Sequence, residues 1–136
     1  MVKKMCVSVF SGSVDRLTGL AMLVSGAAAM GMKVELFLQL WGAYAFKKDV
    51  ISKNMNFSEF PDKAPEVAKR LQELKLPSWF ELIKEAKKVG DVKIYLCSTA
   101  AAIWNVKKED LELVDEVIGA GEWAEKSSEA DITLFV

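Results

Sequence analysis

Five short apolar runs, separated by segments with helical patterns, constrain the fold of this chain more than any other feature. The runs cover residues 5–10, 33–40, 91–96, 113–118 and 131–136. Because each run is almost continuously apolar, we expect strands that are buried on both faces, as in a parallel sheet. Strands that alternate with helices also favour a parallel sheet, because helical crossovers join its neighbouring strands. The sequence therefore predicts an α/β fold in which helices cover both faces of a five-stranded sheet.

Local signals place the helices between these runs. Ser11-Gly12-Ser13 is typical of a turn and helix cap, and it precedes a helix expected over 14–30. Ser78 and Glu81 have the spacing of a capping box, which predicts a helix over 79–89 that Gly90 ends. Further helices are expected at 43–50, at 65–74, after Cys97 as far as Trp104, and at 122–130. Nothing indicates a second domain, so we expect one domain over residues 1–136.

Cys97 is the leading candidate for chemistry. It follows an apolar run and precedes Ser98 and Thr99, small hydroxyl residues that could open a helix. A sulfur at such a junction meets unpaired backbone N–H groups and the positive end of the helix dipole, which both favour the thiolate. The chain has no histidine, so no imidazole can activate another nucleophile. Cys6 stands inside the first run and is expected to be a small buried hydrophobe.

The loops that follow the strands form the expected ligand-binding rim. In a parallel sheet these loops emerge at one edge, where ligands bind. Small residues dominate the loops here, and glycine lets a backbone approach a ligand closely. The candidate pocket residues are Ser11, Gly12, Ser13, Trp41, Gly42, Ser98, Thr99, Gly119 and Gly121. Two alternatives stay open: the serines and Thr99 could serve as helix caps alone, and Trp41 could be a core or interface aromatic.

Composition excludes several classes of function. The formal net charge is −1, which provides neither a basic field for nucleic acid nor a polybasic patch for a membrane. The uncharged run 17–32 is short for a membrane span and is bracketed by Arg16 and Lys33, so a buried helix is expected. The lack of histidine and of a paired-cysteine motif argues against a metal, and no cofactor is expected. Two cysteines without a secretory signal favour a reducing, cytoplasmic setting.

The absence of histidine also narrows what a reactive Cys97 could do. A thiol protease needs a general base and acid to release the amine product. Sulfur exchange has no such need, because a thiolate attacks a sulfur atom and expels a thiolate or a sulfite-like group. We therefore expect thiolate exchange with small sulfur anions or protein persulfides.

Three segments resemble the DsrE/DsrF-like sulfur-relay family, and the similarity is greatest to the branch often labelled "peroxiredoxin family". They are Phe37-Leu38-Gln39-Leu40-Trp41-Gly42-Ala43-Tyr44-Ala45-Phe46-Lys47-Lys48, Val92-Lys93-Ile94-Tyr95-Leu96-Cys97-Ser98, and Gly119-Ala120-Gly121 with the closing Leu134-Phe135-Val136. The resemblance implies a three-layer α/β sandwich with a mostly parallel five-stranded sheet and assembly into homo-oligomers. It also implies a cysteine, by position Cys97, that carries sulfane sulfur as persulfide or thiosulfonate.

The resemblance further implies a small sulfur-carrier protein of the TusA type as partner. Peroxidase activity is not implied, because the Thr-x-x-Cys arrangement of true peroxiredoxins is missing. Some relatives have a second cysteine shortly after the first, whereas Ile103, Trp104 and Asn105 fill that stretch here. A single-cysteine carrier is therefore expected in place of a two-cysteine relay.

Two hypotheses follow. The first is a cytoplasmic sulfurtransferase or sulfur carrier in which Cys97 accepts sulfur and passes it to a partner cysteine. The second is a non-catalytic subunit that binds a nucleotide or a protein at the same rim, with Cys97 inert. A homo-oligomer (dimer, trimer or higher) is expected from the resemblance and from an apolar content of 51%.

Overall fold

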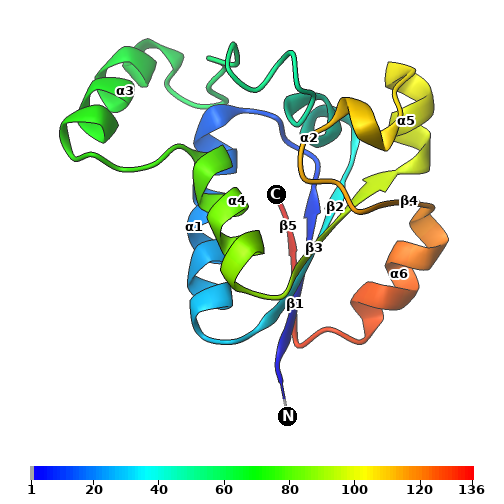
Figure 1. Cartoon of the computed structure of the whole chain (residues 1–136). Coiled ribbons are helices and arrows are strands. Elements are labelled where there is room, and N and C mark those ends of the chain that lie inside the picture. The colour runs from blue at the N-terminus through cyan, green and yellow to red at the C-terminus, as the bar shows by residue number, and fades with distance from the viewer. Residues whose placement is uncertain (1) are drawn as a thin grey trace.

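The computed structural model describes residues 2–136, and its centre is a sheet of five parallel strands (Figure 1). The strands are β1 (Lys4–Val9), β2 (Lys33–Leu38), β3 (Val92–Cys97), β4 (Glu116–Ile118) and β5 (Ile132–Phe135). Their order across the sheet is β4-β3-β2-β1-β5, and each neighbouring pair runs parallel. The predicted α/β fold with a five-stranded parallel sheet is confirmed.

Helices form the two outer layers. On one face α1 (Val14–Ala29) and α4 (Trp79–Val89) pack against each other, and α6 (Ala120–Ser128) covers the other face (Figure 1). At the carboxyl ends of the strands α2 (Leu40–Ala45) contacts α5 (Ser98–Trp104). The remaining elements are α3 (Ala64–Glu73), which projects from the body in Figure 1, and the short 3₁₀ helices η1 (Pro61–Lys63) and η2 (Lys108–Asp110).

Small residues let α1 lie close to its neighbours. α1 buries Leu17, Leu20, Ala21, Val24 and Ala27. A Cβ added at Gly90, at the end of α4, would lie 2.9 Å from the Cβ of Ala28, so only glycine fits this crossing without a shift. Within residues 2–136, no helix combines the length and the apolar character that a membrane span requires.

The second strand ends earlier than predicted. The sequence predicted a strand over 33–40 and a helix over 43–50, whereas β2 ends at Leu38 and α2 occupies Leu40–Ala45. Trp41 and Gly42 therefore lie in a helix and not in a loop. The Gly42 N–H donates to the Phe10 carbonyl oxygen at 2.9 Å, and an added Cβ would lie 2.1 Å from the Val9 carbonyl oxygen. The absence of a side chain at Gly42 thus lets α2 close over the end of β1.

The fourth strand is half as long as predicted. Residues 113–118 were expected in the strand, but β4 covers only Glu116–Ile118. The reason is Asp115, whose carboxylate accepts hydrogen bonds from the Ile94 N–H at 2.8 Å and from Lys87 Nζ at 2.5 Å. The Asp115 carboxylate therefore accepts the Ile94 N–H in place of a backbone carbonyl, and the hydrogen-bonded pairing with β3 begins one residue after Asp115, at Glu116.

Other boundaries lie close to the prediction. α4 has the predicted bounds, and the Ser78 hydroxyl accepts the Glu81 N–H at 3.2 Å as its cap. The last helix begins at Ala120, two residues before the predicted start. Gly119 is therefore the N-cap of α6, and Gly121 lies in its first turn and not in a loop.

Candidate functional site

Cys97 is the last residue of β3 and the N-cap of α5. Its backbone is extended, with φ −63° and ψ 127°, and its side chain is 7% exposed. Within the described chain, the Cys97 side chain makes no capping hydrogen bond to the first turn of α5. Ser98 and Thr99 form that turn and are exposed. The thiol therefore lies just under the surface at the carboxyl edge of the sheet, beside an accessible turn of polar side chains.

Ser98 and Gly119 come from different strand-end loops and meet beside the thiol. A Cβ added at Gly119 would lie 3.9 Å from Ser98 Oγ, which is ordinary van der Waals contact. Cys97 pairs with Ile118, the residue before Gly119, in the β3–β4 ladder. Cys97, Ser98 and Gly119 thus form one group, which we call the thiol group. Gly121 is the second residue of α6, and a Cβ added to it would enter open space.

The first two strand-end loops surround a cavity instead. This cavity has a volume of about 810 Å³ and lies between the loop after β1, α2 and the segment 49–56. Of the predicted pocket residues it is lined by Ser11, Gly12, Ser13 and Trp41. Cys97, Ser98, Thr99, Gly42, Gly119 and Gly121 are not among its lining residues. The predicted rim is therefore divided between the thiol group and this cavity, and Gly42, Thr99 and Gly121 belong to neither.

Gly12 is needed for packing of the rim itself. A Cβ at Gly12 would lie 2.3 Å from the Trp41 carbonyl oxygen, so the loop after β1 touches the backbone of α2. Asn54 Nδ2 donates to the Gly12 carbonyl oxygen at 2.8 Å from the other side. The glycine thus allows close approach between two segments of the chain, a role that the sequence had suggested for a ligand.

An aromatic cluster joins the thiol helix to the cavity wall. The Trp104 indole N–H, at the end of α5, donates to the Leu40 carbonyl oxygen at 2.8 Å. The Trp104 ring lies 4.6 Å from the Tyr44 ring and 5.3 Å from the Trp41 ring, measured between centroids. Tyr44 and Trp104 are not among the pocket residues predicted from the sequence. Spacing could have indicated Tyr44, because it stands three residues after Trp41 and shares its helical face.

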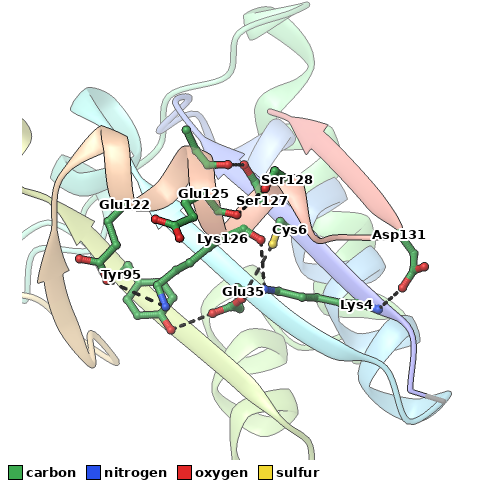
Figure 2. Close-up of polar contacts among 11 residues, drawn as sticks. Lys4, Cys6, Glu35, Tyr95, Glu122, Glu125, Lys126, Ser127, Ser128 and Asp131 are labelled. Atoms are coloured by element: carbon green, nitrogen blue, oxygen red, sulfur yellow. Dashed lines mark hydrogen bonds and ion pairs between the residues drawn. The ribbon is translucent and has the colours of Figure 1, made fainter.

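A buried polar network lies under α6, on the face of the sheet that carries Cys6 (Figure 2). Glu35 is 2% exposed, pairs with Lys4 Nζ at 2.5 Å and accepts the Tyr95 hydroxyl at 2.8 Å. Burial alone would raise the pKa of Glu35, but hydrogen bonds from Lys4 and Tyr95 outweigh it and hold that pKa below its usual value. Burial, together with Glu35, raises the pKa of Tyr95. Glu35 is therefore an ionised carboxylate inside the core.

Cys6 belongs to this network and not to the rim. Its side chain is 1% exposed, and its sulfur lies 4.0 Å from a Glu35 carboxylate oxygen. Burial raises the pKa of the Cys6 thiol, and Lys4 offsets this only in part. The thiol form is favoured, as the sequence analysis expected for a buried hydrophobe. Within residues 2–136 both cysteines are free, and no three His, Cys, Asp or Glu side chains group closely enough to hold a metal ion.

Comparison with known proteins gives the family. The family model described as "DsrE/DsrF-like family" matches residues 13–135. Among solved structures, the chain is similar to MTH1491 from Methanobacterium thermoautotrophicum, a protein of unknown function, at 14% identity and a TM-score of 0.61, with 98% of this chain and 99% of that chain covered. It is also similar to the ychN protein from E. coli, at 18% identity and a TM-score of 0.57, with 100% of both chains covered. At these identities the two structures show the fold alone. The comparison with curated proteins gave no match. Since the family model spans nearly all of the sequence, the chain belongs to the DsrE/DsrF-like family.

Proposed function

We propose that this protein is a sulfurtransferase or sulfur carrier that holds sulfane sulfur on Cys97. The observation that carries the proposal is the position of Cys97, a free thiol at the carboxyl end of β3 in a chain of the DsrE/DsrF-like family, whose general role is sulfur relay. The edge at which it lies is where parallel α/β sheets bind ligands. The second thiol, Cys6, is fully buried and its pKa is raised by burial, so it competes poorly as a nucleophile.

The proposed loading step needs no general acid. The Cys97 thiolate attacks the sulfane sulfur of a thiosulfate-like anion, an S–S bond to Cys97 forms, and sulfite leaves with the electron pair of the broken S–S bond. With tetrathionate the leaving group is thiosulfate and the product is a thiosulfonate on Cys97. Each leaving group is a stable anion. A chain without histidine can therefore complete the step.

The proposed unloading step is a second thiolate exchange, in which Cys97 is the leaving group and not the nucleophile. A thiolate of the acceptor attacks the outer sulfur of the Cys97 persulfide, and the Cys97 thiolate leaves. Cys97 is only 7% exposed, whereas Ser98 and Thr99 beside it are exposed. An acceptor cysteine must therefore approach over the first turn of α5, which favours a protruding cysteine on a small protein. We propose a TusA-type carrier as that acceptor, on the strength of the family resemblance.

The assembly and the compartment belong to the same proposal. We expect a homo-oligomer, because β5 is an edge strand on which Ile132 is 41% exposed. Light scattering should then give a mass of at least twice 15.1 kDa, and a 15.1 kDa species would contradict the expectation. Two free thiols support a reducing, cytoplasmic setting.

The test is mass spectrometry after incubation with tetrathionate and, separately, with polysulfide. We expect a sulfur-containing adduct on Cys97 that is lost on addition of a TusA-type protein. That protein should gain the same group, a thiosulfonate after tetrathionate and a persulfide after polysulfide. Cys6→Ser is the matched control and should form the same adduct. The proposal fails if the adduct persists in Cys97→Ser or forms equally on Cys6. Reaction at Cys97 no faster than at an unstructured thiol would support the non-catalytic alternative instead.

A further inference from the structure

The cavity beside α2 is unused by the sulfur chemistry proposed for Cys97. Its volume of about 810 Å³ lies in the range of small-molecule sites, which is roughly 300–1,000 Å³. It opens at the carboxyl ends of β1 and β2, the edge at which parallel α/β sheets hold ligands. A concave, pre-formed hollow at this edge is better suited to a small ligand than to a flat protein surface.

Aromatic rings supply most of the apolar residues in the walls. Trp41 is 50% exposed and Phe135 is 71% exposed, although side chains of this size are usually buried. Phe10 and Phe135 stack with their ring centroids 5.9 Å apart, and Trp41 meets Tyr44 edge-on at 6.3 Å. The hollow therefore presents flat apolar faces from two directions, which suits a flat ring.

The polar part of the lining carries more positive than negative charge. Arg16 and Lys53 line the cavity against one acidic residue, Asp49. Asp49 already lies 3.9 Å from Lys47, which is outside the lining. Within residues 2–136 Lys53 makes no ion pair, and Arg16 is 3.9 Å from its carboxylate neighbour, the exposed Glu59. Arg16 also donates from Nε to Ser58 Oγ at 3.1 Å, so its outer guanidinium N–H groups, together with Lys53, are available to an anion.

Hydrogen bonds hold the cavity open in advance. Asn54 Nδ2 donates to the Gly12 carbonyl oxygen at 2.8 Å, and the Val14 N–H donates to the Asn56 carbonyl oxygen at 2.7 Å. Further along, the Asp15 carboxylate accepts the Ser58 N–H at 3.0 Å. The segment that carries Lys53 is thus fixed to the start of α1, so a ligand need not order it.

We propose that this cavity binds a small organic anion with a flat aromatic ring, about the size of a nucleoside monophosphate. The ring packs between Trp41 and the Phe10–Phe135 pair. The anionic group faces Arg16 and Lys53. The site is independent of the sulfur chemistry, because Cys97 does not line it.

The test is titration with adenosine 5′-monophosphate, followed by the indole N–H signals in a proton–nitrogen NMR spectrum. The four tryptophans give separate reporters. We expect the Trp41 signal to move while those of the buried Trp79 and Trp123 stay in place. Trp41→Ala should weaken binding by about tenfold, since stacking on one aromatic ring is worth that much or more. Phe60→Ala, exposed and outside the cavity, is its control and should bind as the parent does.

Charge is tested with adenosine and with inorganic phosphate as separate probes. Lys53→Ala should weaken nucleotide binding about threefold to fivefold and leave adenosine binding unchanged, whereas Lys84→Ala on α4 should alter neither. Equal affinity for adenosine and the nucleotide, or for phosphate and the nucleotide, would overturn the proposal. A Trp41 signal that moves with protein concentration in the absence of ligand would also overturn it, because a second copy of the chain would then cover Trp41. Cys97→Ser should bind the nucleotide normally, so this result is separable from failure of the sulfur chemistry.

Discussion

Replacing Lys4 by methionine should invert the pH dependence that Glu35 gives to stability. Lys4 is the cation that pairs with the buried Glu35 carboxylate, and its own side chain is only 16% exposed. Methionine keeps most of the volume of lysine but supplies no charge. Lys4→Met therefore leaves a carboxylate in the core with Tyr95 as its remaining hydroxyl donor.

The cost follows from the burial of Glu35. Removing one partner of a buried ion pair typically destabilises a protein by about 3–5 kcal/mol. Because Tyr95 still donates at 2.8 Å, we expect the lower end of that range, about 3 kcal/mol at neutral pH. For a domain of this size that corresponds to a fall in Tm of roughly 10 °C.

The sign of the pH dependence separates this explanation from a simple loss of packing. In the parent, hydrogen bonds from Lys4 and Tyr95 outweigh burial and lower the pKa of Glu35. Its contribution is therefore present above the unfolded pKa of about 4.3 and is lost as pH falls through the folded pKa. In Lys4→Met both the hydrogen bond and the charge of Lys4 are lost, so burial is opposed only by Tyr95 and Lys126, and we expect that pKa to rise. Stability should then be lost as pH rises above about 4.3.

The assay is urea unfolding at several pH values between about 4 and 7, with Lys3→Met as the matched control. Lys3 is an exposed neighbour, so its replacement should cost little at any pH. Asp15, whose pKa is lowered by hydrogen bonds from Ser58 and Glu59 despite burial, contributes equally to both variants and cancels in their difference. The difference in unfolding free energy between Lys4→Met and Lys3→Met should shrink toward pH 4. A difference that is absent, or constant with pH, would refute the role given to Lys4.

Two further predictions concern local geometry. Gly42→Ala should destabilise the protein by about 1–3 kcal/mol, because its Cβ would lie 2.1 Å from the Val9 carbonyl oxygen. Gly19→Ala, with open space in the interior of α1, should stabilise it by about 0.5–1 kcal/mol. If the two alanines have equal effects in urea unfolding, the close contact at α2 is wrong. Ser78→Ala should cost about 1 kcal/mol through loss of the α4 cap, and Ser78→Asp should restore it; a silent Ser78→Ala would show that the cap is unnecessary.

Elements with local determinants could be predicted from the sequence. β2 is the middle strand of the sheet, and its residues from Val34 to Leu38 are all buried, so it appears in the sequence as an apolar run. Ser78 and Gly90 bound α4 through a cap and a stop that act within one turn of the helix. These signals need no knowledge of distant residues.

Boundaries that depend on distant residues were wrong. Asp115 shortens β4 because it bonds to Ile94 and Lys87, which precede it by more than twenty residues. α2 can lie against the end of β1 only because Gly42 has no side chain, and a Cβ there would meet the Val9 carbonyl oxygen. Helix and strand propensity and hydrophobic periodicity depend on residues a few positions apart, so neither can predict contacts between segments that are distant in the sequence.

The two-part division of the rim has the same origin. The sequence predicted one continuous rim, because a parallel sheet brings its strand-end loops to one edge and these loops are rich in small residues. The structure places Ser98 and Gly119 beside Cys97, whereas Lys53 reaches the loop after β1 because Asn54 bonds to Gly12, 42 positions earlier. The segment 51–61 has no period, so nothing in its sequence indicated this contact.

The two parts nevertheless share a support. α5 begins at Cys97, and at its other end Trp104 bonds to the Leu40 carbonyl oxygen and packs on Tyr44, a residue of the cavity wall. Three rings and one hydrogen bond therefore fix the helix that carries the thiol to the helix that carries Trp41. Aromatic contacts of this kind are worth about 0.5–1.5 kcal/mol each beyond the area they bury, so the junction is rigid compared with an exposed loop. Cys97, at the start of this helix, makes no capping hydrogen bond through its side chain, so its sulfur is available for the bond that the proposed transfer requires.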